Sequence, residues 1–192
     1  MLLNAFRRLF SNAQNRKARR ASGLPRPELL QFEDRITPTT FSVINNADSG
    51  VGSLRQAIID ANTTPGNDII NFSSSPVTII TLASALPNII NASTVITGGT
   101  AGTVTINVLN NSSITIDANK GNFNIFSIAS GGNLSISGVT VTGANTSDTG
   151  GAFNNAGTLN ISNSTLSGNS SGGNGGGISN SGTLTVTNST IS

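Results

Sequence analysis

The chain has 192 residues, which is enough for one domain and a tail, with 9% charged residues, 4% aromatic residues and no His, Cys, Trp or Tyr. The absence of Cys excludes disulfide bonds and thiolate metal sites, and the absence of His excludes Ser-His-Asp catalysis, whereas Ser–Lys catalysis stays open. Residues 1–35 carry eight Lys or Arg against three Asp or Glu, and residues 36–192 carry two against five, so the basic charge belongs to the N-terminal segment.

Residues 1–40 are predicted to form a basic, export- or leader-like tail with little fixed structure. The first apolar side chains of this tail have helical spacing, which indicates a short amphipathic helix: Leu2, Leu3, Phe6, Leu9 and Phe10. No apolar run approaches the ~18 residues that a membrane-spanning helix needs. Basic tails bind nucleic acid in other proteins, but no aromatic stacking platform accompanies this one, so we expect no nucleic-acid partner.

The end of this tail contains a short acidic and basic motif, Glu33-Asp34-Arg35, within the stretch Arg26–Pro38. The stretch resembles the N-terminal motif of planctomycete extracellular proteins, in which an Arg-rich run precedes a Leu-Glu-x-Leu-Glu-Asp-Arg-like core. Phe32 stands in place of the second Leu of that core, and Leu30 in place of its first Glu. The resemblance implies export in a large surface-associated protein, and we therefore expect a secreted, extracellular or cell-surface location.

Residues 41–72 are predicted to form a strand–helix–strand cap. Phe41–Asn46 alternates as a strand does, and Ser53 and Gln56 have the spacing of a capping box, in which each residue satisfies a backbone amide of the other. The helix that follows presents an apolar face, ends near Pro65, and leads into a strand at Asp68–Phe72; the face consists of Leu54, Ala57, Ile58 and Ala61. Such a helix shields the open end of a stacked core from water.

The segment Asp48–Ile58 within this cap resembles the "CSLREA" region that precedes β-helix repeats in bacterial surface proteins. Gln56 replaces the Glu of that region, and Val51-Gly52 lies near the position of its leading Cys. The resemblance implies a surface location and a β-helix architecture, and it brings no known catalytic residue.

Three segments repeat with a spacing of 25 residues: Asn133–Ser137, Thr158–Ser162 and Thr183–Thr187. Four sets of apolar residues keep this register: Leu134, Leu159 and Leu184; Ile136, Ile161 and Val186; Val141, Leu166 and Ile191; and Ile128, Phe153 and Ile178. A fixed register indicates a solenoid, and the alternation within each segment indicates strands with one face inward. The alternative, a Gly/Ser/Asn-rich linker, gives no reason for the register.

We therefore predict an all-β fold, a right-handed parallel β-helix over residues 73–192 that is incomplete at its C-terminus, with three strands and three corners in each coil. Aligned Asn residues, Asn155 with Asn180 and Asn163 with Asn188, are expected to form side-chain ladders along the stack. Upstream of the regular repeats, irregular first coils are expected, with short strands at 77–82, 94–96, 104–108, 114–116 and 123–126.

Tetrapeptides in the repeats are similar to those of chlamydial polymorphic outer-membrane proteins. Gly150–Phe153 and Gly175–Ile178 approximate the Gly-Gly-Ala-Ile motif, and Leu166–Asn169 approximates Phe-x-x-Asn with Leu in place of Phe. The similarity implies an exported β-helix.

The charged residues beyond position 69 are Asp117, Lys120 and Asp148. One coil after Asp117 the chain reaches position 142, so Asp148 lies about six residues further round the coil and the two carboxylates are not expected to share a site. Asp148 lies in a turn sequence, where a corner role is expected, and Asp117 and Lys120 are expected to solvate a bend. Gly172–Gly175 is similar to a Ca²⁺-binding loop that lacks its Asp. We predict no catalytic, cofactor-binding or metal-binding residue.

These features lead to one functional hypothesis and one alternative. The hypothesis is a non-catalytic extracellular or cell-surface scaffold for adhesion or macromolecular interaction, with polysaccharide or protein partners and end-to-end self-association through the uncapped C-terminal coil. The alternative is the N-terminal part of a carbohydrate-active enzyme, similar to polysaccharide lyases or hydrolases, whose catalytic coils lie beyond residue 192.

Overall fold

The described part of the chain is a stack of parallel strands with one short helix. The computed structural model describes residues 38–72, 79–90, 104–107 and 114–192, all of which belong to one compact unit that spans residues 36–192. Every strand pairing among these residues is parallel. The prediction of an all-β parallel β-helix is therefore confirmed. Residues 1–37 of the predicted tail lie outside the described residues.

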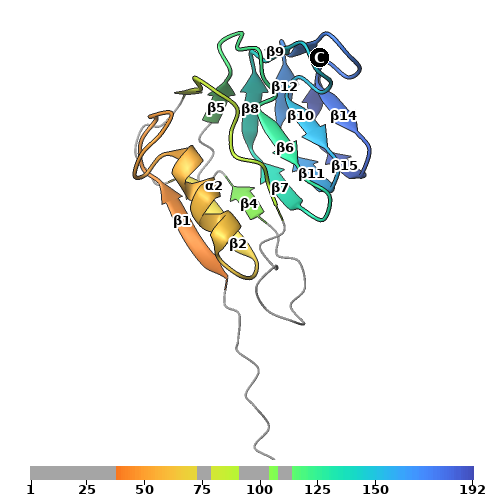
Figure 1. Cartoon of the computed structure of the whole chain (residues 1–192). Coiled ribbons are helices and arrows are strands. Elements are labelled where there is room, and N and C mark those ends of the chain that lie inside the picture. Colours follow the sequence, from red (N-terminus) through yellow and green to blue (C-terminus); the bar gives the residue numbers. More distant parts are fainter. Residues whose placement is uncertain (1–37, 73–78, 91–103, 108–113) are drawn as a thin grey trace, which may run out of the picture. The chain divides into compact units, whose positions relative to one another are not determined.

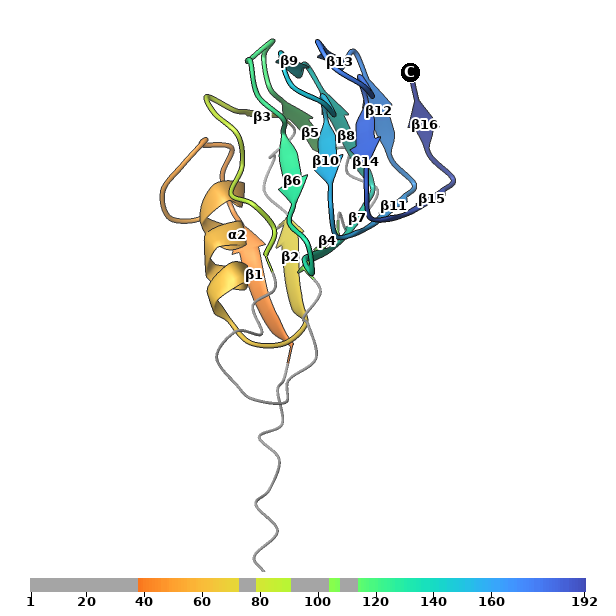
Figure 2. The same cartoon turned by 45° about the vertical axis from the view of Figure 1, so that its right-hand side comes forward.

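Four sheets run along the stack, and Figures 1 and 2 show their strands side by side. Sheet A contains β1 (Thr39–Val43), β2 (Asp68–Phe72), β4 (Val104–Asn107), β7 (Asn133–Ser137), β11 (Thr158–Ser162) and β15 (Thr183–Thr187). Sheet B contains β3 (Ile79–Thr81), β5 (Ile114–Asp117), β8 (Val139–Thr142), β12 (Thr165–Ser167) and β16 (Thr190–Ile191). Sheet C contains β6 (Phe126–Ile128), β10 (Phe153–Asn155) and β14 (Ile178–Asn180), and sheet D contains β9 (Asn145–Thr146) and β13 (Ser170–Ser171).

The last coils have the register that the sequence predicts. Leu159 pairs with Leu134 in the preceding coil and with Leu184 in the following one, which confirms the spacing of 25 residues in sheet A. Within a coil the chain passes through sheets C, A and B in turn, as expected for three strands. The two-residue strands of sheet D add a fourth, short contact between successive coils, which was not predicted.

The predicted alignment of Ile128 with Phe153 is wrong. Phe153 pairs with Phe126, and Ile128 pairs with Asn155, so the register in sheet C is shifted by two residues at this step. The reason is the corner that follows: four residues, Ala129 to Gly132, separate β6 from β7, whereas only Ala156 and Gly157 join β10 to β11. The longer corner has Gly131 at φ 81. The corner absorbs the extra residues, and the inward apolar positions stay in contact.

The first coils are less regular, as predicted. In sheet A, Thr39 pairs with Asp68, Asp68 with Val104, and Val104 with Leu134, which are spacings of 29, 36 and 30 residues. The strand expected at 123–126 begins only at Phe126, and the strand expected at 94–96 lies outside the described residues.

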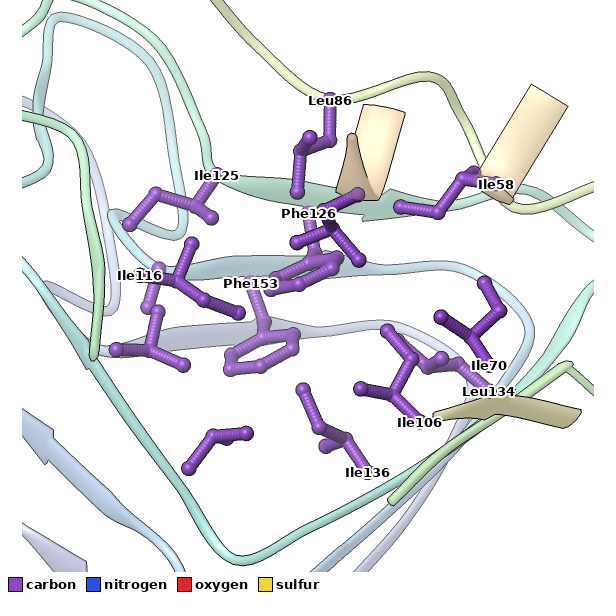
Figure 3. Close-up of a cluster of buried hydrophobic side chains, with 14 of the residues drawn as sticks. Ile58, Ile70, Leu86, Ile106, Ile116, Ile125, Phe126, Leu134, Ile136 and Phe153 are labelled. Carbon is purple, nitrogen blue, oxygen red and sulfur yellow. The ribbon is translucent and has the colours of Figure 1, made fainter. Parts of the chain in front are cut away.

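The core consists of apolar columns that run along the axis (Figure 3). In sheet A one column contains Ile70, Ile106, Ile136 and Ile161, which follow one another in register and are at most 1% exposed. In sheet C the rings of Phe126 and Phe153 stack with centroids 5.0 Å apart and an interplanar angle of 8°. Burial of these side chains supplies the main driving force for the fold, at ~25 cal/mol per Å² of apolar surface removed from water.

The corners are held by polar side chains that bond from one coil to the next. The buried Asn155 donates from Nδ2 to Oδ1 of Asn180 at 2.6 Å and to the carbonyl of Thr183 at 2.9 Å, which confirms this ladder. Asn163 and Asn188 share a different property, a left-handed backbone with φ of 49° and 50°. Asn tolerates this conformation better than most residues, and it forms the tight corner before sheet B.

The cap is built around α2 (Leu54–Thr63), which begins at the predicted N-cap Ser53. The Ser53 hydroxyl accepts from the Gln56 amide at 3.2 Å, but the Gln56 side chain does not complete the capping box, because its Nε2 donates to Asp60 at 2.8 Å. The Ser53 amide donates to the Gly50 carbonyl instead. The predicted apolar face of α2 is buried and packs against β1 and β2, at the end of the stack opposite the C-terminal coil (Figure 2).

The last strands β14, β15 and β16 have no described strand paired with their outer edges. Val186 and Ile191 are 39% and 48% exposed, whereas Ile161 and Leu166, their counterparts one coil earlier, are 1% and 0% exposed. The edges of β14, β15 and β16 therefore present apolar side chains and backbone groups that another β-strand can pair with.

Candidate functional site

The three charged residues of the later coils lie at corners or beside them. Asp117 ends β5 and pairs with Thr142, as predicted, and its Oδ1 accepts from the Asn119 amide at 2.7 Å. Lys120 is exposed with φ of 62°, and its amide donates to the Gly143 carbonyl. Asp148 is exposed, and its amide donates to the Thr146 hydroxyl at 3.1 Å. The Asp117 carboxylate is thus bonded to the backbone of its own corner, and Asp148 lies in an exposed bend, which agrees with the corner roles expected from the sequence.

Arg55 forms a clasp that the sequence reasoning missed. Its guanidinium bonds the Asp48 carboxylate at 2.7 Å and also donates to the carbonyls of Ser84 and Ala85. The Asp48 carboxylate in turn accepts from the Ala83 amide at 3.1 Å. The clasp ties the loop before α2 to the segment 82–90. The signal in the sequence was weak, because the partners of Arg55 are backbone atoms about thirty residues away.

The clasp also sets the ionisation of Asp48. Partial burial of the carboxyl opposes its charged form, but the hydrogen bonds from Arg55 and from the Ala83 amide outweigh that penalty, so the pKa of Asp48 lies below its usual value of 3.8. A carboxylate that is firmly ionised and paired in this way stabilises the cap.

Asp68 is the second feature that the sequence reasoning missed. It is 1% exposed and lies in an inward column of sheet A, between Thr39 and Val104. Its Oδ1 accepts from the Thr39 amide at 3.3 Å. Burial raises the pKa of Asp68 above 3.8, and the bond from Thr39 offsets only part of that rise. The alternation of β2 places position 68 in the core, whereas an Asp residue is expected at the surface.

The outer faces of sheets A and B are lined by hydroxyl and amide side chains. The outward positions of the last coils of sheet A are Asn133, Ser135, Ser137, Thr158, Asn160, Ser162, Thr183, Thr185 and Thr187. In the strands of sheet B, Asp117 is the one charged residue among the described positions, and no aromatic residue occurs there. In the later coils this surface is thus polar, repetitive and almost uncharged, whereas the first coils expose Ile69 in sheet A and Ile79 in sheet B.

Within the part of the chain that the structure describes, no three His, Cys, Asp or Glu side chains gather as ligands for a metal ion. The Gly172–Gly175 loop, which is similar to a Ca²⁺-binding loop, is largely exposed, and Gly175 has φ of 74°. Across the same described residues, no helix has the length and apolar character needed to cross a membrane.

The capped stack of parallel coils defines this protein as a parallel β-helix of the solenoid class. Comparisons of the chain with family models, with curated proteins and with solved structures give no match. The resemblances drawn from short motifs therefore remain predictions.

Proposed function

We propose that this protein is a non-catalytic extracellular or cell-surface scaffold that binds other macromolecules along the outside of its β-helix. The observation that carries the proposal is the outer surface of sheets A and B, where Ser, Thr and Asn side chains repeat from coil to coil in a fixed register. The stacked core makes this surface rigid, so binding a long partner costs little ordering of the protein.

The N-terminal motifs add support for an external location. The segment Arg26–Pro38 resembles an export-associated motif, and Asp48–Ile58 resembles a region found in bacterial surface proteins. Fusing residues 1–192 to a reporter enzyme that is active only outside the cytoplasm tests this location in a bacterial host. Reporter activity that is lost when residues 1–35 are deleted is the expected result, and activity confined to the cytoplasm contradicts the location.

Binding is tested by passing the chain over purified polysaccharides and over cell-envelope proteins, and by assaying the polysaccharides for new chain ends. The scaffold predicts retention without release of new ends. Release of reducing or unsaturated ends by the complete gene product, lost when acidic residues downstream of position 192 are replaced, would favour the alternative of a carbohydrate-active enzyme.

We further propose end-to-end association of the 192-residue chain through its open C-terminal coil. Val186 and Ile191 are the exposed apolar residues of that coil, and the edges of β15 and β16 supply backbone groups for pairing. Sedimentation should show dimers that Val186→Lys dissociates, whereas Val51→Lys, at an 89% exposed position in the cap loop, leaves them intact. Monomers at every concentration would refute this association.

A further inference from the structure

The outer face of sheet B carries four threonines in unbroken register. Thr115 pairs with Thr140, Thr140 with Thr165, and Thr165 with Thr190, and we call these four residues the threonine column. A second column beside it contains Asp117, Thr142 and Ser167. Rungs of a parallel sheet are ~4.8 Å apart, and alternate residues of one strand are ~6.6 Å apart. The two columns therefore form a rectangular array of hydroxyl groups with the Asp117 carboxylate at one position.

The positions of these hydroxyls are fixed by the backbone. Thr has two heavy atoms on Cβ, which restricts its first side-chain torsion, and the two middle residues of the column lie on strands that are paired on both sides. Thr140 and Thr165 are partly exposed, and Thr190 is exposed. Among the described residues their hydroxyls make no hydrogen bond within the protein, so each has a donor and an acceptor available to a ligand.

The repeat points to a polymer as the ligand. Identical groups at every rung can all be used only by a partner that has a translational repeat of its own, close to the spacing between rungs. Folded proteins other than solenoids lack such a repeat, and a small molecule reaches one or two rungs at most. An extended chain of sugars that lies along the axis meets one hydroxyl after another.

The charge and the side-chain chemistry of sheet B further restrict the chemical class of the ligand. The strands of sheet B contain one charged residue, Asp117, and no Lys or Arg, so a polyanion finds nothing to neutralise there. They also contain no aromatic residue on which a sugar ring can stack. Binding then depends on many neutral hydrogen bonds, each of small net value, and must grow steeply with the length of the ligand.

We propose that the threonine column is a binding site for an extended neutral polysaccharide that runs along the axis of the solenoid. The inference rests on the proposed function, because it names the ligand class and the face of the same scaffold. The partner is recognised by hydroxyl-to-hydroxyl bonds in register, and its affinity is independent of ionic strength.

The test is titration calorimetry of the 192-residue chain with soluble β-glucan, glucomannan and xylan, each as polymer and as short oligomers, and with polygalacturonate as the acidic comparison. The titrations are done at high salt, which screens the basic N-terminal segment. The first variant is Thr140→Val/Thr165→Val, which removes two hydroxyls but keeps the β-branched shape. The matched control is Ser127→Ala/Ser179→Ala, which removes two hydroxyls from sheet C, outside the surface proposed for binding, and circular dichroism verifies the fold of both.

We expect at least one neutral polymer to bind, its oligomers to bind far more weakly, and polygalacturonate to give no signal. The sheet B variant should bind on the order of 10- to 30-fold more weakly, from two lost neutral hydrogen bonds, and the sheet C control should match the original chain. The proposal is overturned if no neutral polymer binds, if polygalacturonate binds as well as the neutral polymers, or if both variants behave alike. Retention on envelope proteins would still support the scaffold if the glycans fail, so the two failures are distinguishable.

Discussion

Two leucine-to-alanine variants test whether the stacked columns stabilise the fold. One truncates a leucine in the middle of an apolar column, and the other truncates a leucine at the end of the same column. Leu159 is fully buried between Leu134 and Leu184, and Leu159→Ala leaves a cavity that rungs on both sides prevent from collapsing. Such a change costs ~2–5 kcal/mol, and we expect ~4 kcal/mol here because both neighbours are fixed by backbone pairing.

Leu184→Ala is the matched control, because it removes the same atoms from the same column in the last coil. Leu184 is partly exposed and has a rung on one side only, so solvent fills the space that it leaves. About half of the ~1.5–3 kcal/mol of a full burial is then lost, which gives a difference of ~2–3 kcal/mol between the two variants.

The assay is urea unfolding followed by far-ultraviolet circular dichroism, since the chain has no Trp or Tyr to report by fluorescence. The comparison requires the same slope of unfolding free energy against urea concentration in both variants. A different slope would indicate that coils of the solenoid unfold separately from one another. Equal losses in the two variants, or a larger loss for Leu184→Ala, would refute the interpretation that coil-to-coil stacking buries these side chains.

Three further predictions concern polar and glycine positions. Asp68→Asn should stabilise the chain near neutral pH. The pKa of Asp68 is raised in the folded state, so the stability that this residue contributes is complete below pH 3.8 and is lost as the pH rises through the folded pKa. The advantage of the variant should therefore vanish in urea titrations done below pH 3.8. Asn155→Ala should cost ~1–3 kcal/mol, because it leaves the partners of its buried amide, among them Asn180 Oδ1, without their bonds; a thermal midpoint equal to that of the original chain contradicts the ladder. Gly157→Ala should lower the yield of folded protein, since a Cβ there would lie 2.3 Å from the Gly132 carbonyl oxygen. The control is Gly177→Ala, whose Cβ would meet only the Ile191 side chain. Equal circular dichroism spectra of the two variants would contradict this close approach.

The regular part of the fold was predictable because its physics is local and repeated. The alternation of Asn133–Ser137 and its copies states which side chains point inward, and the spacing of 25 states which ones meet, so the pairing of Leu134 with Leu159 needed no three-dimensional information. The cap was predictable for a related reason, because the N-cap Ser53 and the apolar face of α2 lie within a few residues of each other.

The features that escaped prediction depend on contacts that are far apart in the sequence or on chain length at corners. The Arg55 clasp uses the carbonyls of Ser84 and Ala85, and any residue supplies a carbonyl, so the sequence carries no sign of the contact. The buried Asp68 contradicts the usual preference of its residue type. The sequence predicted only a scaffold for macromolecular interaction, because identifying the threonine column required the exact pairing of β5, β8, β12 and β16.

The extra residues after Ile128 show that the length of a coil is set by its corners and that the core does not fix it. Phe126 still stacks on Phe153, although the chain between them and the next strands differs by two residues. A fold whose corners vary in length accepts insertions without a change in its core. New loops can therefore be inserted at the Ala129–Gly132 corner and displayed at a defined position along the solenoid axis.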